Sequence, residues 1–139
     1  MAKKVGDLMT RDPVLLEPTA TVRDAARMMR DHDIGTVLVA DKGQLVGMVT
    51  DRDIVVRGLA EKDDAVRMPV MAVASTELTA LTPNDSVDQA VKLMRSQAVR
   101  RFPVVDSGKP VGIVTMGDLV MELDPKSALA AISAADPNR

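Results

Sequence analysis

Two stretches of this chain end an apolar run on a threonine and place an aspartate three residues later. The pairs are Thr50 with Asp53 and Thr115 with Asp118, and a glycine lies three residues before each threonine. This pattern predicts a polar pair at each of two strand-to-helix corners. The spacing also fits a capping box, in which the threonine is the N-cap and the aspartate is the third helical residue. Capping alone would therefore explain both pairs without any ligand.

The sequence lacks the residues that several other kinds of chemistry require. The chain has no cysteine, which excludes disulfides, thiolate catalysis and cysteine-based zinc sites, and agrees with a reducing compartment. His32 is the single histidine and lies between two aspartates near a predicted helix end, so we interpret it as a solvated residue and expect no metal site. We find no nucleophile–base pair and do not expect an enzyme.

Charge and hydropathy favour a soluble cytoplasmic protein. Eighteen basic and twenty acidic residues give a net charge of −2, and neither sign forms a long block, so we expect no nucleic-acid partner. The apolar runs have the length of strands, and Met1 leads into the first element without a signal-peptide core. We therefore expect no membrane partner. Hydrophobic residues make up 46% of the chain, with one phenylalanine and ten methionines, which predicts one aliphatic core filled in places by methionine.

The chain is an internal repeat. A shift of 65 positions, without a gap, superposes identical residues along most of its length. Examples are Val5 on Val70, Leu16 on Leu81, Pro18 on Pro83, Val22 on Val87, Val39 on Val104, Gly47 on Gly112, Thr50 on Thr115 and Asp53 on Asp118.

Each copy has the same predicted order of elements. An amphipathic turn and an extended piece lead to a helix, which Thr21 and Asp24 cap in the first copy, and Ser86 and Gln89 in the second as a better capping box. Two strands joined by an Asp- and Gly-containing turn follow, and a last helix begins after each threonine. We expect the first of these helices to stop at Gly58. The predicted strands are residues 36–40, 45–50, 102–105 and 111–115.

The predicted fold is α/β, with two β-α-β-β-α repeats packed about a pseudo-twofold axis, because a unit of about 50 residues cannot bury its sheet face alone. The predicted boundaries are residues 4–58 and 69–123 for the repeats, 59–68 for a charged, solvated linker and 124–139 for a C-terminal tail. Within the tail, residues 127–132 could form one or two helical turns, and the tail either frays or docks on a partner.

The duplicated Gly-x-x-Thr-x-x-Asp motif, each copy closing a β-α-β-β-α unit, resembles a tandem pair of cystathionine-β-synthase-type (CBS) domains, called a Bateman module. The resemblance covers residues 4–123. The stretches at residues 29–35 and 50–55 are especially similar to stand-alone bacterial two-domain members, including the mycobacterial hypoxic-response type. Relatives of that type can carry zinc, but the cysteine that such a site would use is missing here.

This resemblance implies that an adenosine-containing ligand binds in the cleft between the repeats: AMP, ADP, ATP, S-adenosylmethionine or a dinucleotide such as NAD(H). Asp53 or Asp118 would hold a ribose, since a carboxylate can accept from both vicinal hydroxyls. Thr50 and Thr115 would donate to a phosphate or ribose oxygen beside the amides of a helix start.

The adenine would need an apolar slot with backbone hydrogen-bonding groups, and we expect it near Val14, Ala80, Val37 and Pro103. The candidate phosphate partners are Arg52, Arg100 and Arg101, because guanidinium groups match phosphate geometry. The shift of 65 aligns Arg100 and Arg101 with Gly35 and Thr36, and Arg52 with Gly117. The two sites are therefore unequal in charge, and we expect at most one to hold a polyphosphate.

Two functional hypotheses follow. In the first, the chain is a non-catalytic sensor that signals ligand binding to a regulated partner protein. In the second, it is a structural dimerisation module with vestigial, ligand-free clefts. A homodimer is expected in both, since two such modules commonly pair in this family.

Overall fold

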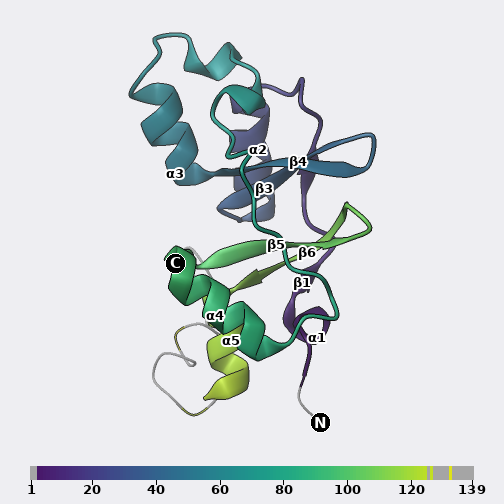
Figure 1. Cartoon of the computed structure of the whole chain (residues 1–139). Helices are drawn as coiled ribbons and strands as arrows, with labels where there is room; N and C mark the ends of the chain where they lie inside the picture. Colours follow the sequence, from purple (N-terminus) through teal and green to yellow (C-terminus); the bar gives the residue numbers. More distant parts are fainter. Residues whose placement is uncertain (1–2, 125, 127–131, 133–139) are drawn as a thin grey trace. The chain divides into compact units, whose positions relative to one another are not determined.

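The computed structural model describes residues 3–124, 126 and 132, and it divides into two compact units (Figure 1). One unit consists of residues 14–78. The other combines residues 3–13 with residues 79–124. Each unit contains one three-stranded sheet and several helices, which confirms the predicted α/β class. The helical turns predicted at residues 127–132 lie largely outside the described residues.

The unit of residues 14–78 has a sheet in the order β2–β3–β4. Strand β2 is parallel to β3, and β3 is antiparallel to β4. The helical elements follow the strands closely along the chain. The elements are β2 (Leu15–Leu16), α2 (Val22–His32), β3 (Thr36–Asp41), β4 (Gln44–Thr50), α3 (Asp51–Asp53), the π-helix η1 (Ile54–Leu59) and the 3₁₀ helices η2 (Ala65–Arg67) and η3 (Val70–Ala72).

The second unit has a sheet in the order β1–β6–β5, in which both pairings are antiparallel. A parallel bridge between Leu81 and Val104 takes the place of the β2–β3 pairing, since Leu16 and Val39 are the residues 65 positions earlier. The elements are α1 (Val5–Leu8), β1 (Thr10–Arg11), α4 (Val87–Gln97), β5 (Arg101–Asp106), β6 (Lys109–Thr115) and α5 (Met116–Leu123).

The two hairpins repeat each other in detail. Both have a register shift one residue past the middle of the first strand, at Val39/Ala40 and at Val104/Val105. Both turn through two residues with positive φ, a geometry that matches the twist of the flanking strands. These turn residues are Lys42 (φ 53°) with Gly43 (φ 81°), and Ser107 (φ 54°) with Gly108 (φ 82°).

The first segment of each repeat packs on the sheet that contains the hairpin of the other repeat. Thr10 pairs with Ile113 of β6, and at the equivalent place Ser75 pairs with Met48 of β4. A Cβ atom on Gly112 would lie 2.6 Å from Met9 Sδ and 2.8 Å from the Thr10 carbonyl oxygen. The strand therefore needs glycine where the exchanged segment crosses it.

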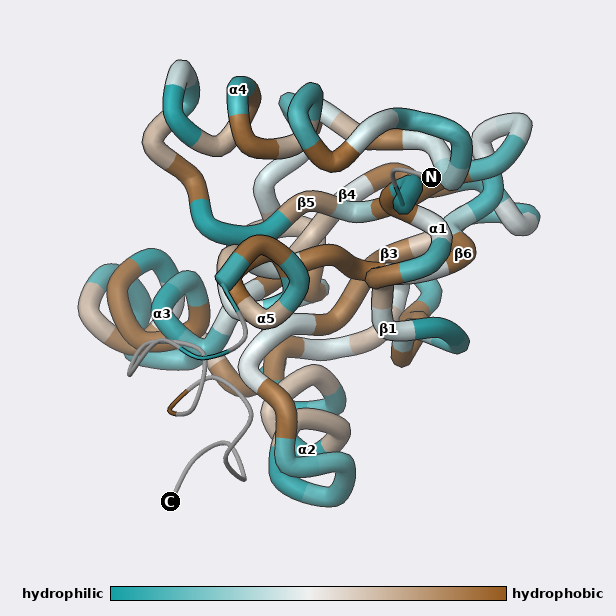
Figure 2. Tube along the Cα trace, turned by 90° about the horizontal axis from the view of Figure 1, so that it is seen from below, coloured by the Kyte–Doolittle hydropathy of each residue, from teal (hydrophilic) through white to brown (hydrophobic). Residues whose placement is uncertain are grey.

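The two cores are aliphatic, as predicted. In the unit of residues 14–78, the core consists of side chains from α2, the strands, η1 and η3, with methionines packed at its margin. In Figure 2, hydrophobic and hydrophilic stretches alternate along α2, as expected for a helix with one buried face. The buried residues of that face are Val22, Ala25 and Met29. In the second unit the core includes the single phenylalanine, Phe102, which is 2% exposed.

The capping of one of the two long helices differs from the prediction. In α2 the Asp24 N–H donates to Thr21 Oγ1 (3.1 Å) and the Thr21 N–H donates to Asp24 Oδ2 (2.9 Å), so the capping box is complete. In α4 the Gln89 N–H donates to Ser86 Oγ (3.1 Å), and the described residues show no returning bond from the glutamine side chain. The prediction of a better box in the second copy was wrong, because glutamine must order more rotatable bonds than aspartate to reach back.

One prediction for the segment between the repeats was also wrong. Gly58 does not stop the helix, since η1 continues to Leu59 and the following residue remains in the right-handed helical region. Gly58 is buried, and a Cβ there would meet Val73 Cγ1 at 3.5 Å, an ordinary van der Waals distance, so packing does not explain why this residue is glycine. The predicted solvated linker is exposed at Asp63 and Asp64, but Ala65 is only 1% exposed and anchors η2 to the unit.

Candidate functional site

The first Thr–Asp corner lies where β4 passes into α3. Thr50 is extended (φ −109°, ψ 163°), which ends the strand and sets the N-cap of the helix. The Thr50 N–H donates to Asp53 Oδ2 (2.9 Å), and the Asp53 N–H donates to Thr50 Oγ1 (3.1 Å). Both residues are half-buried. The capping interpretation is therefore correct as far as it goes.

The second corner repeats the first where β6 passes into α5. The Thr115 N–H donates to Asp118 Oδ2 (2.8 Å), and the Asp118 N–H donates to Thr115 Oγ1 (3.2 Å). Thr115 and Asp118 are also half-buried. The same local sequence has thus produced the same geometry twice, in two separate units.

Capping does not use all the hydrogen-bonding capacity of these side chains. An ionised carboxylate has two oxygens with about four acceptor sites, and the box engages only Oδ2 of each aspartate. Each threonine hydroxyl accepts one bond and still has a proton to donate. Asp53 and Asp118 can therefore cap a helix and accept hydrogen bonds from a polar ligand through Oδ1 at the same time.

The neighbouring strand contributes a different residue to each corner. In register, Thr115 pairs with Arg101 of β5, whereas Thr50 pairs with Thr36 of β3. The hairpin thus brings Arg101 beside the second corner and a nearly buried threonine, 7% exposed, beside the first. Thr36 was missed as a neighbour of the site by the sequence analysis, although the predicted hairpin register would have identified it.

The residue before each of these strand positions anchors the helix start. The Met116 N–H donates to the Arg100 carbonyl (2.8 Å), and the Asp51 N–H donates to the Gly35 carbonyl (3.0 Å). The Arg100 side chain is exposed next to the second corner. At the equivalent position a Cβ on Gly35 would lie 3.1 Å from Asp51 Oδ2, so the aspartate there favours glycine.

Arg52 is the cation of the first corner. It lies between Thr50 and Asp53, its side chain is exposed, and its N–H donates to Asp51 Oδ1 (2.8 Å). The two corners are therefore unequal in charge, with two arginines at the second and one at the first.

The four residues predicted near the adenine are placed unequally. Val14 and Ala80 are half-buried, whereas Val37 and Pro103 are fully buried. The Val37 side chain belongs to the core of its unit, so only its backbone could serve a ligand. The ligand role of these four residues stays a prediction.

A backbone difference distinguishes the two extended pieces. The Leu38 N–H donates to the Val14 carbonyl (3.0 Å), but the residue equivalent to Leu38 is Pro103, which has no N–H. The carbonyl of Thr79, which is equivalent to Val14, therefore cannot accept that bond. The proline marks this difference between the two copies in the sequence.

Two duplicated α/β units, each with a Thr–Asp corner at the end of its hairpin, define a tandem pair of equivalent repeats. The family model of the CBS domain matches residues 5–59 and 70–124. The chain belongs to the CBS domain family and contains two copies of the domain, as the sequence predicted.

Similar proteins cover nearly the whole chain. The CBS domain-containing protein YhcV of Bacillus subtilis (strain 168) is 41% identical over 130 residues, which are 93% of this chain and 92% of YhcV. Hypoxic response protein 1 of Mycobacterium tuberculosis is 33% identical over 129 residues, 92% of this chain and 90% of that protein. In the crystal structure of CBSX2 in complex with AMP, the protein chain is 26% identical in sequence to this chain and superposes with a TM-score of 0.75. The match covers 86% of this chain and 95% of the CBSX2 chain.

Two features are absent from the described residues. These residues contain no group of three or more histidine, cysteine, aspartate or glutamate side chains arranged to hold a metal ion. None of the described helices combines the length and hydropathy that crossing a bilayer requires.

Proposed function

We propose that this CBS pair is a non-catalytic regulatory module that binds an adenosine-containing ligand at its Thr–Asp corners and signals to a partner protein. The candidate ligands are AMP, ADP, ATP, S-adenosylmethionine and NAD(H). The cytoplasmic location expected from the sequence stays a prediction.

One observation carries the proposal: the corner geometry occurs twice, and each time it leaves a carboxylate oxygen and a hydroxyl proton unused by the cap. Vicinal ribose hydroxyls are donors that match such a carboxylate. The likeness to CBSX2, whose crystal structure is a complex with AMP, supports this class of ligand.

The charges favour different ligands at the two corners. Arg100 and Arg101 adjoin Thr115 and Asp118, so we assign the ligand with more phosphate groups to the second corner. The first corner, with Arg52, takes a ligand with less negative charge. Binding regulates a partner only when the ligand has unequal affinity for two conformations of the module.

The experiment is isothermal titration calorimetry with the five candidate ligands, on the wild type and on Asp53→Asn and Asp118→Asn. Asparagine retains one oxygen to accept the cap bond but replaces the second acceptor by a donor. We expect at least tenfold weaker binding of the preferred ligand when its corner is changed, since hydrogen bonds to a charged acceptor contribute about 1.5–3 kcal/mol each.

Asp24→Asn is the matched control. Asp24 makes the same capping box with Thr21 but lies at neither corner, so its variant tests the effect of altering a cap alone. Binding that is unchanged in both corner variants, or weakened equally by Asp24→Asn, would contradict the ribose role.

The chain offers a second readout. With one phenylalanine and no tyrosine or tryptophan, the protein absorbs very weakly at 260–280 nm. A peak at 260 nm in the purified protein would therefore report a bound adenine directly, and mass spectrometry of the released molecule would identify it.

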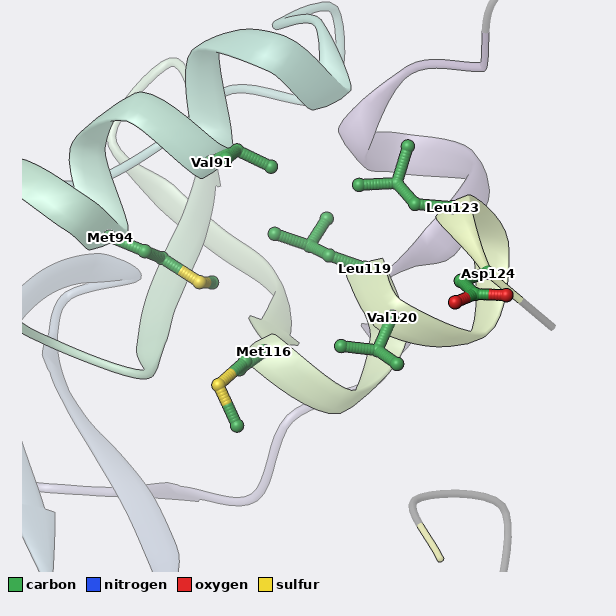
Figure 3. A pocket seen from close by; sticks show the side chains of 7 residues that line it. All are labelled: Val91, Met94, Met116, Leu119, Val120, Leu123 and Asp124. Atoms are coloured by element: carbon green, nitrogen blue, oxygen red, sulfur yellow. The ribbon is translucent and has the colours of Figure 1, made fainter. Parts of the chain in front are cut away.

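A structural dimerisation module is the second candidate function, and exposed apolar side chains favour it. Helices α4 and α5 line a cavity of about 370 Å³ that is open to the surface (Figure 3). Except for Asp124, its lining is apolar: Val91, Met94, Met116, Leu119, Val120 and Leu123. In the other unit, η1 exposes Val55, Val56 and Leu59, and Val55 is equivalent to Val120. The same helix of each repeat thus presents an apolar surface, which marks an interaction site.

We propose that a second copy of the chain covers these surfaces. Size-exclusion chromatography with light scattering, recorded by refractive index, is expected to give twice the monomer mass of 14.9 kDa. Leu123→Glu and Val55→Glu should shift the mass toward that of the monomer. The control Lys92→Glu, at a polar position of α4, should not shift it. A monomeric wild type would remove this candidate, and a dimer that binds none of the five ligands would favour it over the sensor.

A further inference from the structure

A basic cavity lies in the unit of residues 14–78, and its lining contains neither Thr50 nor Asp53. It has a volume of about 320 Å³ and is formed by the first half of α2 and the 3₁₀ helix η2. Its lining is Thr21, Arg23, Asp24, Arg27, Val66 and Arg67. The cavity therefore joins a helix of the first repeat to the segment that connects the repeats.

The walls of this cavity are held in place by backbone contacts. The Val22 N–H donates to the Met68 carbonyl (2.9 Å), and Thr21 forms an antiparallel bridge with Pro69. Ala65, at the start of η2, and Val70, just beyond it, are 1% and 0% exposed. The backbone that carries Arg67 is thus fixed on both sides and held next to the start of α2.

The charge in the cavity is positive. Arg23 and Arg27 are one helical turn apart, so they lie on the same face of α2, and Arg67 joins them from η2. Among the described residues, no carboxylate forms an ion pair with Arg23 or Arg27. Arg67 is 3.7 Å from Asp64, with side chains 84% and 73% exposed, and an ion pair as exposed as this contributes little.

Asp24 is the one acidic side chain of the lining. Its Oδ2 accepts the Thr21 N–H, and the hydrogen bonds with Thr21, followed by the charge of Arg27, hold its pKa below the usual range. The carboxylate is thus directed to the helix cap. Three cations face the cavity against one anion that is already hydrogen-bonded.

The fold itself does not require this cluster. The residues equivalent to Arg23, Asp24 and Arg27 on α4 are Asp88, Gln89 and Lys92, and α4 forms an equally long helix with them. Arg23 and Arg27 are like charges one turn apart on α2, whereas Asp88 and Lys92 are opposite charges on α4, so the cationic pair is specific to the first copy.

We propose that Arg23, Arg27 and Arg67 form a binding site for a small phosphate-type anion, separate from the adenosine site. Guanidinium groups match phosphate oxygens with paired hydrogen bonds. Val66 is the only apolar side chain of the lining, so the cavity offers no slot for a nucleobase. A bound anion ties the connecting segment to α2 and would thereby make the fold of the first unit sensitive to phosphate compounds.

The test is calorimetric titration of sodium pyrophosphate into the full chain at constant ionic strength, with orthophosphate, sulfate and chloride in parallel. We expect saturable 1:1 binding of pyrophosphate, weaker binding of orthophosphate and sulfate, and none of chloride. Arg27→Gln and Arg67→Gln should each weaken pyrophosphate about tenfold, since each removes a charge-assisted contact. The matched control is Lys92→Gln, at the position of α4 equivalent to Arg27, and it should bind like the wild type.

Several outcomes would overturn the inference. The first is a wild type that shows no saturable binding of pyrophosphate. The second is pyrophosphate affinity in both Arg27→Gln and Arg67→Gln equal to that of the wild type. The third is loss of pyrophosphate binding in Asp118→Asn or Asp53→Asn, which would place the anion at a corner. The three arginines are exposed, so circular dichroism at 222 nm should show unchanged folding in the variants. Saturating adenosine, which has no phosphate, should leave the affinity for pyrophosphate unchanged, because the two ligands bind at separate sites. The two proposals are therefore tested independently, and this inference can fail while the adenosine proposal stands.

Discussion

The crossing of β6 by the exchanged N-terminal segment predicts that Gly112→Ala destabilises the protein while Gly47→Ala does not. The two glycines are equivalent in the repeats, and neither has a positive φ. At Gly112 the new Cβ would lie 2.6 Å from Met9 Sδ and 2.8 Å from the Thr10 carbonyl oxygen. At Gly47 the nearest atom would be Ala74 Cβ at 3.3 Å, a tight contact that a shift of a few tenths of an ångström relieves.

The magnitude follows from two opposing effects. Inserting a methyl group into a packed site costs about 1–3 kcal/mol. Replacing glycine by alanine at a permitted φ returns about 0.4–1 kcal/mol by restricting the unfolded chain. Met9 Sδ ends a flexible side chain and can move, but the Thr10 carbonyl belongs to the β1–β6 pairing and cannot move cheaply. We therefore expect a net loss of about 1–2 kcal/mol for Gly112→Ala and a change near zero for Gly47→Ala.

The assay is urea and thermal unfolding followed by circular dichroism at 222 nm, because the chain has no tryptophan or tyrosine for fluorescence. For a chain of this size, the expected loss in Gly112→Ala lowers the Tm by about 3–8 °C. Equal stability of the two alanine variants would refute the reasoning, since it would mean that the N-terminal segment does not press on β6 as described.

Three further predictions concern charge and burial. Arg101→Gln should weaken ATP binding about tenfold and leave adenosine binding unchanged by calorimetry, and an equal loss for both would contradict a phosphate contact. Because the pKa of Asp24 is lowered in the folded protein, its stabilising effect is present above the ordinary aspartate pKa of about 3.9 and is lost as pH falls through the lower folded value. Urea unfolding should therefore show wild type more stable than Asp24→Ala at pH 6, with a gap that shrinks toward pH 2, and a gap that widened on acidification would be contrary to this. Ala65→Asp should lower the stability by more than about 3 kcal/mol, since it buries an unpaired charge, whereas Ala72→Asp, at an exposed site, should change it little in the same urea assay.

The features with a local cause could be predicted from the sequence. Identity at a spacing of 65 residues established two copies, and the threonine and aspartate of each corner have the spacing of a capping box. The polar pairs at Thr50 and Thr115 were therefore expected where the structure has them, at the ends of β4 and β6. Such arguments work because a strand end and a helix cap depend on a few consecutive residues.

The features that depend on distant pairing could not be predicted in the same way. Nothing near Thr10 indicates that it pairs with Ile113, about a hundred residues away, rather than within its own repeat. The glycine at 112 was the available signal, since glycine inside a strand marks a close backbone approach. Gly58 was misread as a helix stop, although η1 continues to Leu59 and Gly58 has no positive φ.

The exchanged segments change what a cut between the repeats would do. Cleavage at the exposed Asp63–Asp64 bond would produce two fragments. The first would contain the N-terminal segment of one unit and residues 14–63 of the other. The second would contain residues 64–78 of that other unit and the chain from Thr79 of the first. Each fragment would lack a piece that the other supplies, so the nicked chains should stay interlocked until they unfold. Neither repeat, expressed alone, would carry its whole folding unit, and the pair behaves as the smallest transferable part of this protein.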